Sequence, residues 1–265
     1  MQRLPERGSM DKVPFSEFDL SGKAAIVTGG ARGIGAVICK ASAAEGAKVG
    51  INYRQSREPA EALASEIGPT QATPIPGDVG KEADIMPMFD QLEQAFGPVD
   101  VLINNAAHCP SGPLESYTRG EWERTFAVNV TGAFQASQEF IKRLRVRRAP
   151  GRIVNLASQA AFLGSTSGHL PYDASKGALI SMTRALAREV ARERIAVNAV
   201  APGMVLTEMV AGIWEKRKEM YLARIPLHRI GQPEEIARVV VFLASEAASY
   251  MTGATVDVSG GMLMH

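Results

Sequence analysis

The sequence has few cysteines, almost no net charge and no long apolar run, and each shortage argues against a class of protein. Only Cys39 and Cys109 are present among 265 residues, and two cysteines without ligand spacing argue against a disulfide scaffold or a metal site. The formal net charge of +1 gives no electrostatic basis for nucleic-acid binding. No apolar run approaches the roughly 20 residues that cross a membrane, and no signal-peptide pattern is present. We therefore expect a cytoplasmic protein that binds neither nucleic acid nor a membrane.

The chain does contain enough apolar residues for one large domain, because 46% of it is hydrophobic. We assign residues 20–265 to this domain and residues 1–19, which are polar and irregular, to an N-terminal extension. Within the extension, Gly8-Ser9-Met10 reads either as a cloning remnant before a native Met10 or as native sequence. The basic stretch from Lys142 to Arg152 is interpreted as a solvated helix end that complements the helix dipole, with a docking patch for an acidic partner as the alternative.

Short apolar runs alternate with helical patterns along the domain. Strands that are buried on both faces give near-continuous apolar runs, and their alternation with helices is typical of parallel βαβ units. The sequence therefore predicts an α/β fold: a single doubly wound parallel sheet of the Rossmann type, with about seven strands and helices on both faces. The predicted strands are 24–28, 47–52, 71–76, 99–104, 151–157, 195–200 and 254–258, and the predicted helices are 33–46, 58–67, 81–96, 118–146, 171–191 and 233–244.

A glycine-rich loop follows the first predicted strand and leads into a helix. It reads Thr28-Gly29-Gly30-Ala31-Arg32-Gly33-Ile34-Gly35. Glycines let the backbone approach a pyrophosphate, whose charge is stabilised at a helix N-terminus. A glycine-rich turn without a ligand is the alternative for such a loop taken alone. The candidate dinucleotide contacts in this loop are Gly29, Arg32, Gly33, Ile34 and Gly35.

Tyr172 and Lys176 lie four residues apart in Pro171-Tyr172-Asp173-Ala174-Ser175-Lys176. On a helix, this spacing places both side chains on one face. A lysine ammonium favours the phenolate and so lowers the tyrosine pKa from about 10 towards neutral pH, where a proton-transfer group is most useful. A surface tyrosine beside a helix lysine is the alternative for this pair taken alone.

Together with five further segments, these two motifs resemble the short-chain dehydrogenase/reductase family, in particular its 3-oxoacyl-(acyl-carrier-protein) reductases and related ketoreductases. The resemblance runs from about Leu20 to the C-terminus. It departs from the family at Ala107, where glycine is usual, and in the 14 positions from Ser158 to Tyr172, one more than is most common. The matching segments are Asn104-Asn105-Ala106-Ala107, Val128-Asn129-Val130-Thr131-Gly132, the strand that ends at Ser158, Pro202-Gly203-Met204-Val205-Leu206-Thr207 and Val256-Asp257-Val258-Ser259-Gly260-Gly261.

The resemblance implies roles for the matching residues. Tyr172 would exchange a proton with the substrate oxygen, and Ser158 would hydrogen-bond to the same oxygen and stabilise developing charge. Lys176 would hold the nicotinamide ribose, and Asn129 would hold a water in a proton path from Lys176 to solvent. A variable substrate lid would lie near residues 205–226, and a homotetramer is usual at this length. The other cofactor contacts that it implies are Asp78, Val79, Asn105, Ala106, Pro202, Gly203, Val205 and Thr207.

Two arginines favour NADP(H) as the cofactor. In dinucleotide-binding folds, an acidic residue after the second strand usually accepts hydrogen bonds from the ribose 2′-hydroxyl. Here that strand ends Ile51-Asn52-Tyr53-Arg54, with no carboxylate before Glu58. Arg54, and Arg32 in the glycine loop, can instead bind a 2′-phosphate with a guanidinium fork. The alternative is that both arginines simply face solvent.

The sequence leaves the substrate open. Apolar residues in the lid favour an apolar carbonyl compound, either a 3-oxoacyl thioester, with acyl carrier protein as a partner, or a free ketone, sugar or polyol. A catalytically idle relative that binds NADP(H) as a structural or sensing protein is disfavoured, because Tyr172 and Lys176 are both kept. We therefore expect an NADP(H)-dependent oxidoreductase that interconverts a small-molecule ketone and a secondary alcohol. Cys109 is expected near the cleft. His169 is expected at the surface, with a place in the lining of the substrate pocket as the alternative.

Overall fold

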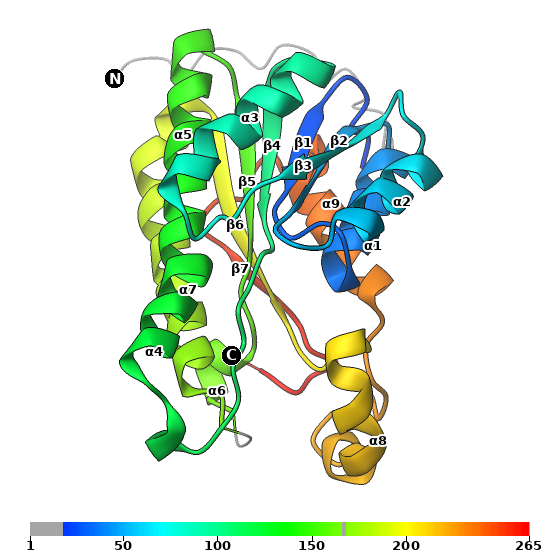
Figure 1. Cartoon of the computed structure of the whole chain (residues 1–265), viewed down its shortest axis with the longest axis vertical. Coiled ribbons are helices and arrows are strands. Elements are labelled where there is room, and N and C mark those ends of the chain that lie inside the picture. Colours follow the sequence, from blue (N-terminus) through cyan, green and yellow to red (C-terminus); the bar gives the residue numbers. More distant parts are fainter. Residues whose placement is uncertain (1–17, 166–167, 265) are drawn as a thin grey trace, which may run out of the picture.

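The computed structural model describes residues 18–165 and 168–264 (Figure 1). Most of the proposed extension, residues 1–17, lies outside the described residues. Its last residues lead directly into the domain, because the Phe18 ring packs edge-on against Phe242 with 5.6 Å between the ring centroids. Leu20 follows and is fully buried in the apolar core.

Within the described residues, seven parallel strands form one sheet in the order β3-β2-β1-β4-β5-β6-β7. This confirms the predicted doubly wound sheet. The order reverses between β1 and β4, and ligands of such sheets bind in the crevice outside the carboxyl ends of the strands at that point. The strands are β1 (Ala24–Val27), β2 (Lys48–Tyr53), β3 (Ala72–Pro76), β4 (Val99–Asn104), β5 (Gly151–Leu156), β6 (Ile195–Pro202) and β7 (Thr255–Val258).

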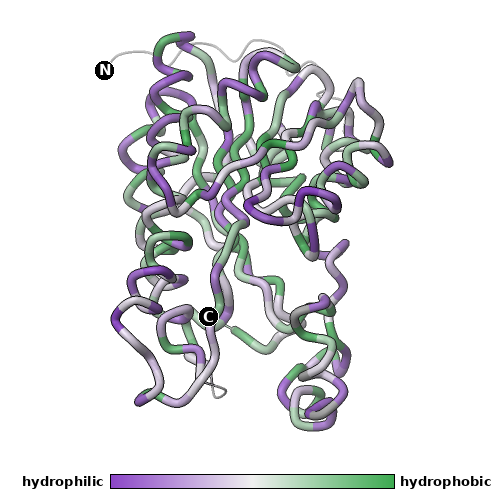
Figure 2. Tube along the Cα trace, in the orientation of Figure 1, coloured by the Kyte–Doolittle hydropathy of each residue, from purple (hydrophilic) through white to green (hydrophobic). Residues whose placement is uncertain are grey.

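Helices cover both faces of the sheet, and each face has its own apolar core. Successive strand side chains point to opposite faces, so Val101 and Ile103 pack in one core and Leu102 in the other. Figure 2 shows hydrophobic residues along the strands, with mixed polar and apolar turns on the helices. One core is covered by α1 (Gly33–Ala44), α2 (Arg57–Ile67) and α9 (Pro233–Ala244), and the other by α3 (Glu82–Phe96), α5 (Ala133–Arg147) and α7 (Leu170–Val190).

The helix predicted over 118–146 is not regular in the structure. α4 (Arg119–Phe126) begins at a capping box in which the Thr118 hydroxyl accepts from the Glu121 backbone N–H and the Glu121 carboxylate accepts from the Thr118 N–H. A π-helical turn, η2 (Ala127–Gly132), then separates α4 from α5. A π turn adds one residue to a helical turn, and apolar periodicity does not resolve so short a change.

The segment predicted as a lid contains a helix that the sequence analysis did not predict, α8 (Glu208–Leu222). It is broken at Arg217, whose φ of −132° and ψ of 21° are not helical. Figure 1 shows α8 standing away from the sheet, below the carboxyl ends of the strands, with α4 and the short α6 (Ala160–Leu163) on the other side. Among the described residues, no helix combines the length and the apolar character needed to cross a membrane.

The basic stretch at the end of α5 places Arg145 and Arg147 in the last turn of the helix, where they complement its dipole. Most of its side chains also form ion pairs within the chain, so they are not simply solvated as predicted. Arg143 binds three carboxylates, with nitrogen–oxygen distances of 2.6–2.7 Å, and its side chain is only 16% exposed. Arg145 pairs with Glu193, Arg147 with Asp100 and Arg152 with Glu246. Because α5 ends just before the amino end of β5, these charges lie at the edge of the sheet opposite the carboxyl ends (Figure 1).

Candidate active site

The glycine loop between β1 and α1 presents free backbone donors at a helix N-terminus. Gly29 and Gly33 have φ of +61° and +56°, which residues with a side chain rarely adopt. A Cβ on Gly35 would lie 2.3 Å from the Gly29 oxygen, so only glycine allows this approach. Arg32 is the exposed N-cap of α1, but it makes no side-chain capping bond, and the first turn contains no acidic residue. The first N–H groups of α1 are therefore suited to an anion.

Asn52 at the end of β2 and Thr28 directly after β1 help to fix this loop. The Asn52 carboxamide oxygen accepts from the Gly29 N–H at 3.1 Å, while its nitrogen donates to the Ile75 and Gly77 oxygens. The Thr28 hydroxyl accepts from the backbone N–H of Asn105 and of Ala106, at 2.9 and 3.0 Å. Sequence analysis missed Thr28 and Asn52, although a polar residue at the end of a buried strand is a usable signal.

Asn105 also holds the glycine loop with its side chain. Its amide nitrogen donates to the Thr28 and Gly29 oxygens at 2.9 and 3.0 Å. Val79 and Val205 are buried in the apolar cores, and Ile34 packs against one of them. Four predicted cofactor contacts, Asn105, Val79, Val205 and Ile34, therefore have side chains that pack against or bond to the protein. Any contact that they make with a ligand would come from their backbone groups.

Tyr172, Lys176 and Ser158 meet at the carboxyl end of β5. The Lys176 ammonium lies 5.4 Å from the centroid of the Tyr172 ring and donates to the Leu156 backbone oxygen. The Tyr172 hydroxyl lies near enough to the Ser158 side chain for that side chain to lower its pKa. The predicted arrangement of one tyrosine and one lysine on the same helix face is therefore present in α7.

The electrostatics of this group differ from the expectation that Lys176 lowers the tyrosine pKa. Burial raises the pKa of the Tyr172 hydroxyl, and the hydrogen bond with Ser158 offsets only part of that rise. Burial also lowers the pKa of Lys176 to about 8, because the ammonium is 2% exposed. At neutral pH, Tyr172 is therefore protonated and able to donate, and Lys176 is mostly charged.

Asn129 joins the π turn to both sides of the site. Its carboxamide oxygen accepts from the His108 N–H at 2.7 Å, and its nitrogen donates to the His108 oxygen at 3.0 Å and to the Ser175 hydroxyl at 2.9 Å. The Ser175 hydroxyl in turn donates to the backbone carbonyl oxygen of Tyr172 at 2.6 Å. The predicted site residue Asn129 thus holds the segment after β4 against the helix that carries Tyr172 and Lys176.

A pocket of about 390 Å³ opens at the start of α7, and the residues that line it do not include Tyr172 itself. The Gly112 N–H donates to the Gly168 oxygen at 2.9 Å, and the Tyr117 hydroxyl donates to the same oxygen at 2.6 Å. These bonds join the loop after β4 to the loop before α7. The pocket is lined by Gly112, Leu114, Tyr117, Gly164, Ser165, Gly168, His169, Leu170 and Asp173.

His169 lines this pocket, so the structure agrees with the alternative for this residue and not with the surface position that was preferred. Its Nδ1 lies 3.0 Å from the Pro110 oxygen and 3.7 Å from the Cys109 sulfur. Cys109 is close enough to Tyr172 and Lys176 to affect the pKa of both, as expected for a residue near the cleft. Burial raises the pKa of Cys109 to about 11, so it is a neutral thiol at physiological pH.

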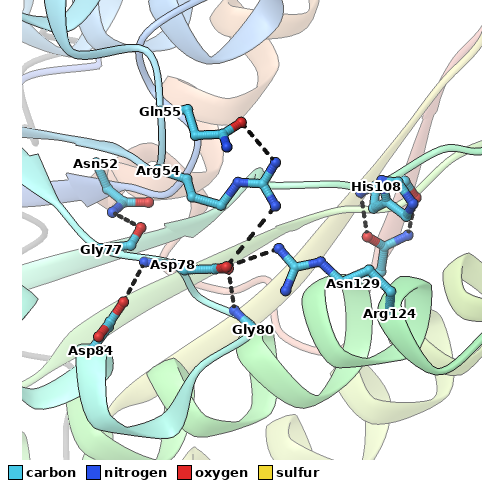
Figure 3. A network of polar contacts seen from close by, with 10 residues as sticks. All are labelled: Asn52, Arg54, Gln55, Gly77, Asp78, Gly80, Asp84, His108, Arg124 and Asn129. Carbon is cyan, nitrogen blue, oxygen red and sulfur yellow. Dashed lines mark hydrogen bonds and ion pairs between the residues drawn. The ribbon is translucent and has the colours of Figure 1, made fainter. Parts of the chain in front are cut away.

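At the other end of the crevice, two arginines converge on one carboxylate (Figure 3). Asp78 accepts from Arg124 Nη2 at 2.9 Å and lies 4.0 Å from Arg54 Nη1. Burial would raise the pKa of Asp78, but the hydrogen bonds from Arg124 and the Gly80 N–H outweigh it and hold the pKa below its ordinary value. Sequence analysis missed Arg124, which lies 46 residues away and gives no local signal.

The segment after β6 closes the crevice from the side of α8. The Pro202 oxygen accepts from the Gln159 N–H at 3.0 Å, and the Gly203 N–H donates to the Val258 oxygen at 3.0 Å. Thr207 is the N-cap of α8, and its methyl group would lie 3.9 Å from a Cβ on Gly33. The segments that follow β1, β4, β5 and β6 thus meet at one edge of the sheet.

This donor set fits a dinucleotide. The uncapped N-terminus of α1 suits the pyrophosphate, Arg54 at the end of β2 suits an adenosine phosphate, and the strand order reverses between the two halves of the crevice. When bound, a nicotinamide dinucleotide supplies hydride transfer.

The chain is similar to known reductases over nearly its whole length. A family model described as enoyl-(acyl carrier protein) reductase matches residues 29–263. The chain is 37% identical to the 3-oxoacyl-[acyl-carrier-protein] reductase FabG of Aquifex aeolicus over 249 residues, which cover 93% of this chain and 99% of the relative. It is 38% identical to the enzyme of the same name from Staphylococcus aureus over 244 residues, 91% of this chain and 98% of the relative.

A solved structure has the same fold. It is a short-chain dehydrogenase/reductase from Brucella melitensis, titled as a glucose/ribitol dehydrogenase, with a TM-score of 0.88 and 33% sequence identity over 94% of this chain and 100% of that one. The match covers nearly the whole chain in both sequence and fold, and the Tyr172–Lys176 pair lies where the strands end. The protein belongs to the short-chain dehydrogenase/reductase family of oxidoreductases.

Proposed function

We propose that this protein is an NADP(H)-dependent ketoreductase that interconverts a ketone or 3-oxoacyl thioester and a secondary alcohol, with Tyr172 as general acid and base. One observation carries the proposal: at the carboxyl end of β5, Tyr172 lies near the Ser158 side chain, and the buried Lys176 ammonium lies 5.4 Å from the centroid of the tyrosine ring. A carbonyl oxygen placed between the two hydroxyls would receive a proton from Tyr172 and a hydrogen bond from Ser158.

The remaining site residues position this group. Lys176 places a positive charge beside the tyrosine ring. This charge would stabilise the phenolate as it forms, and so would counteract the rise in the Tyr172 pKa that burial causes. Asn129 fixes Ser175 and the backbone of His108, which keeps the wall of the crevice in register with α7. Its carboxamide would also hold a water on the proton path to Lys176.

We propose NADP(H) rather than NAD(H) because Arg54 follows β2 and is 51% exposed beside the adenosine end of the crevice. Arg54→Asp is expected to weaken NADPH binding by about ten- to a hundredfold, since a charge-assisted contact contributes roughly 1.5–3 kcal/mol. NADH binding should be nearly unchanged or improved. Fluorescence titration of both cofactors measures this, and a wild-type protein that binds NADH more tightly than NADPH would contradict the assignment.

We propose a 3-oxoacyl thioester as the first substrate class, because the two relatives named above are 3-oxoacyl-[acyl-carrier-protein] reductases. Leu114 and Leu170 are exposed apolar residues that line the pocket, and they suit an acyl chain. A carrier protein as partner draws no support from the basic stretch of α5, whose charges are paired on the opposite edge of the sheet. A sugar or polyol is the second candidate, since Ser165, His169 and Asp173 make part of the pocket polar and a solved relative is titled accordingly.

The function is tested by following NADPH consumption with a panel of substrates. The panel contains a 3-oxoacyl thioester of coenzyme A, the same acyl group on acyl carrier protein, a simple ketone and a sugar. We expect the highest kcat/KM with the thioesters and no turnover with enoyl thioesters. Turnover of the sugar alone, in the oxidative direction, would replace the first substrate class by the second. No turnover of any compound by a protein that binds NADPH would favour an idle relative.

We also propose a cytoplasmic homotetramer. Both cysteines are free thiols, as is usual in a reducing compartment. Trp122 in α4 and Phe134 in α5 are 40% and 44% exposed, which leaves an apolar face on this side of the domain. Light scattering measures the mass of the assembly directly.

A further inference from the structure

The cofactor end of the crevice holds two guanidinium groups and one buried carboxylate (Figure 3). Asp78 is 9% exposed, and both of its oxygens are used: Oδ1 accepts from the Gly80 N–H at 3.0 Å and Oδ2 accepts from Arg124 at 2.9 Å. The Asp78 N–H donates to the Asp84 carboxylate at 2.8 Å. The carboxylate therefore has a fixed position just beyond the end of β3.

The two arginines are not equivalent partners of Asp78. Arg124 makes the hydrogen bond, and its side chain is 31% exposed. Arg54 stays 4.0 Å away, donates to Gln55 at 3.1 Å and is 51% exposed. Because Arg124 neutralises Asp78, the charge of Arg54 remains available to an incoming anion.

The Asp78 carboxylate would also repel an incoming phosphate. A carboxylate beside a phosphate site opposes phosphate binding unless a cation neutralises it. His108 cannot supply that charge: burial lowers its pKa, and the nearby Arg124 and Arg54 lower it further, so the imidazole is neutral at physiological pH. Arg124 is then the described cation that holds Asp78 within hydrogen-bond distance.

On the basis of the NADP(H) preference proposed above, we propose that Arg124 is a positioning residue for cofactor selectivity. It holds the Asp78 carboxylate away from Arg54 and cancels its charge, so that Arg54 can bind the 2′-phosphate. Without Arg124, the carboxylate would pair with Arg54, its nearest remaining cation, and compete with the phosphate. NADH carries no 2′-phosphate and would be little affected.

The test is a double-mutant cycle that measures the dissociation constants of NADPH and NADH by fluorescence titration. Arg124→Met should weaken NADPH binding about tenfold, as expected for loss of a charge-assisted phosphate contact, and change NADH binding less than twofold. Asp78→Asn should leave the selectivity for NADPH intact. The double variant should recover the selectivity of the Asp78→Asn protein, because no carboxylate remains to engage Arg54. Arg124→Lys keeps the charge and should retain most of the selectivity.

Control variants separate positioning from folding. Arg119→Met removes an exposed ion pair with Glu123 on the same helix and should leave both dissociation constants unchanged. Gly80→Ala places a Cβ 2.9 Å from Arg124 Nη1, so it should displace the guanidinium and lower selectivity even if the Arg124→Met protein folds poorly.

Four outcomes would overturn the proposal. A double variant that is as unselective as Arg124→Met would mean that Arg124 contacts the phosphate itself. Equal losses for NADPH and NADH in the Arg124→Met and Gly80→Ala proteins would mean a structural role only. If the wild-type protein prefers NADH, both the proposed cofactor and the proposed role of Arg124 are rejected. If the wild-type protein prefers NADPH and Arg124→Met keeps that preference, only the role of Arg124 is rejected.

Discussion

Tyr172→Phe is expected to lower kcat by about 10²–10⁴-fold, the usual contribution of a positioned general acid or base. The hydroxyl is the proton donor of the proposed reaction, and burial keeps it protonated at neutral pH. Phenylalanine preserves the ring that packs beside Lys176, so the loss should fall on chemistry. NADPH affinity should change by less than about twofold, because the proposed phosphate contacts lie at the glycine loop and Arg54.

The measurement combines steady-state kinetics with NADPH titration of the same preparation. Tyr250→Phe is a matched control, because it removes the same hydroxyl from a fully exposed tyrosine and should leave both quantities unchanged. Tyr172→Phe protein that keeps a tenth or more of the wild-type kcat would remove Tyr172 from the mechanism. A large loss of NADPH affinity without a loss of kcat would assign the hydroxyl to binding.

Lys176→Met should lower kcat/KM about 100-fold or more, because it removes the positive charge that lies beside the tyrosine ring. In the wild-type protein, reduction should also slow as the pH rises through about 8, where the Lys176 ammonium loses its proton. The Lys176→Met protein should lack that step in its pH profile. A wild-type profile that is flat between pH 7 and 9 would contradict the requirement for a charged lysine.

The same substitution predicts a change in stability with a defined sign. The pKa of Lys176 is lowered from 10.5 to about 8 in the folded chain, so between these values the unfolded chain binds more protons. The wild-type free energy of unfolding therefore rises with pH across this window, relative to Lys176→Met, by about 3 kcal/mol. Below pH 8 the cost of burying the ammonium is fully present, and above 10.5 it is gone.

Urea denaturation of both proteins at several pH values from 7 to 11 measures this difference. The comparison cancels the titration of all other groups, since only Lys176 differs. Lys142→Met, at a lysine that is 71% exposed, should show the same pH dependence as the wild type. If Lys176→Met also follows the wild type at every pH, Lys176 titrates near its ordinary value and its charge is not buried.

Local sequence patterns determined the fold class and the chemistry of the site. Each βα unit can be recognised from a window of about 30 residues, because apolar residues recur with different periods in a buried strand and in an amphipathic helix. The glycine loop and the Tyr172–Lys176 pair are also local, since a turn and a single helical turn place their residues without help from the rest of the chain. The same patterns placed Ser158 at a strand end and so in the crevice.

The tertiary structure alone decided how those residues are held and how strongly their charges are perturbed. The bonds of Asn105 to Thr28 and of Arg124 to Asp78 join residues 77 and 46 positions apart, and no periodicity connects such pairs. Burial, which only the packed chain defines, raised the pKa of Tyr172 and lowered that of Lys176. Spacing along the sequence shows that Tyr172 and Lys176 are neighbours on a helix. Their pKa values depend on how much solvent each group loses on folding, because desolvation is caused by atoms that pack around them from every part of the fold.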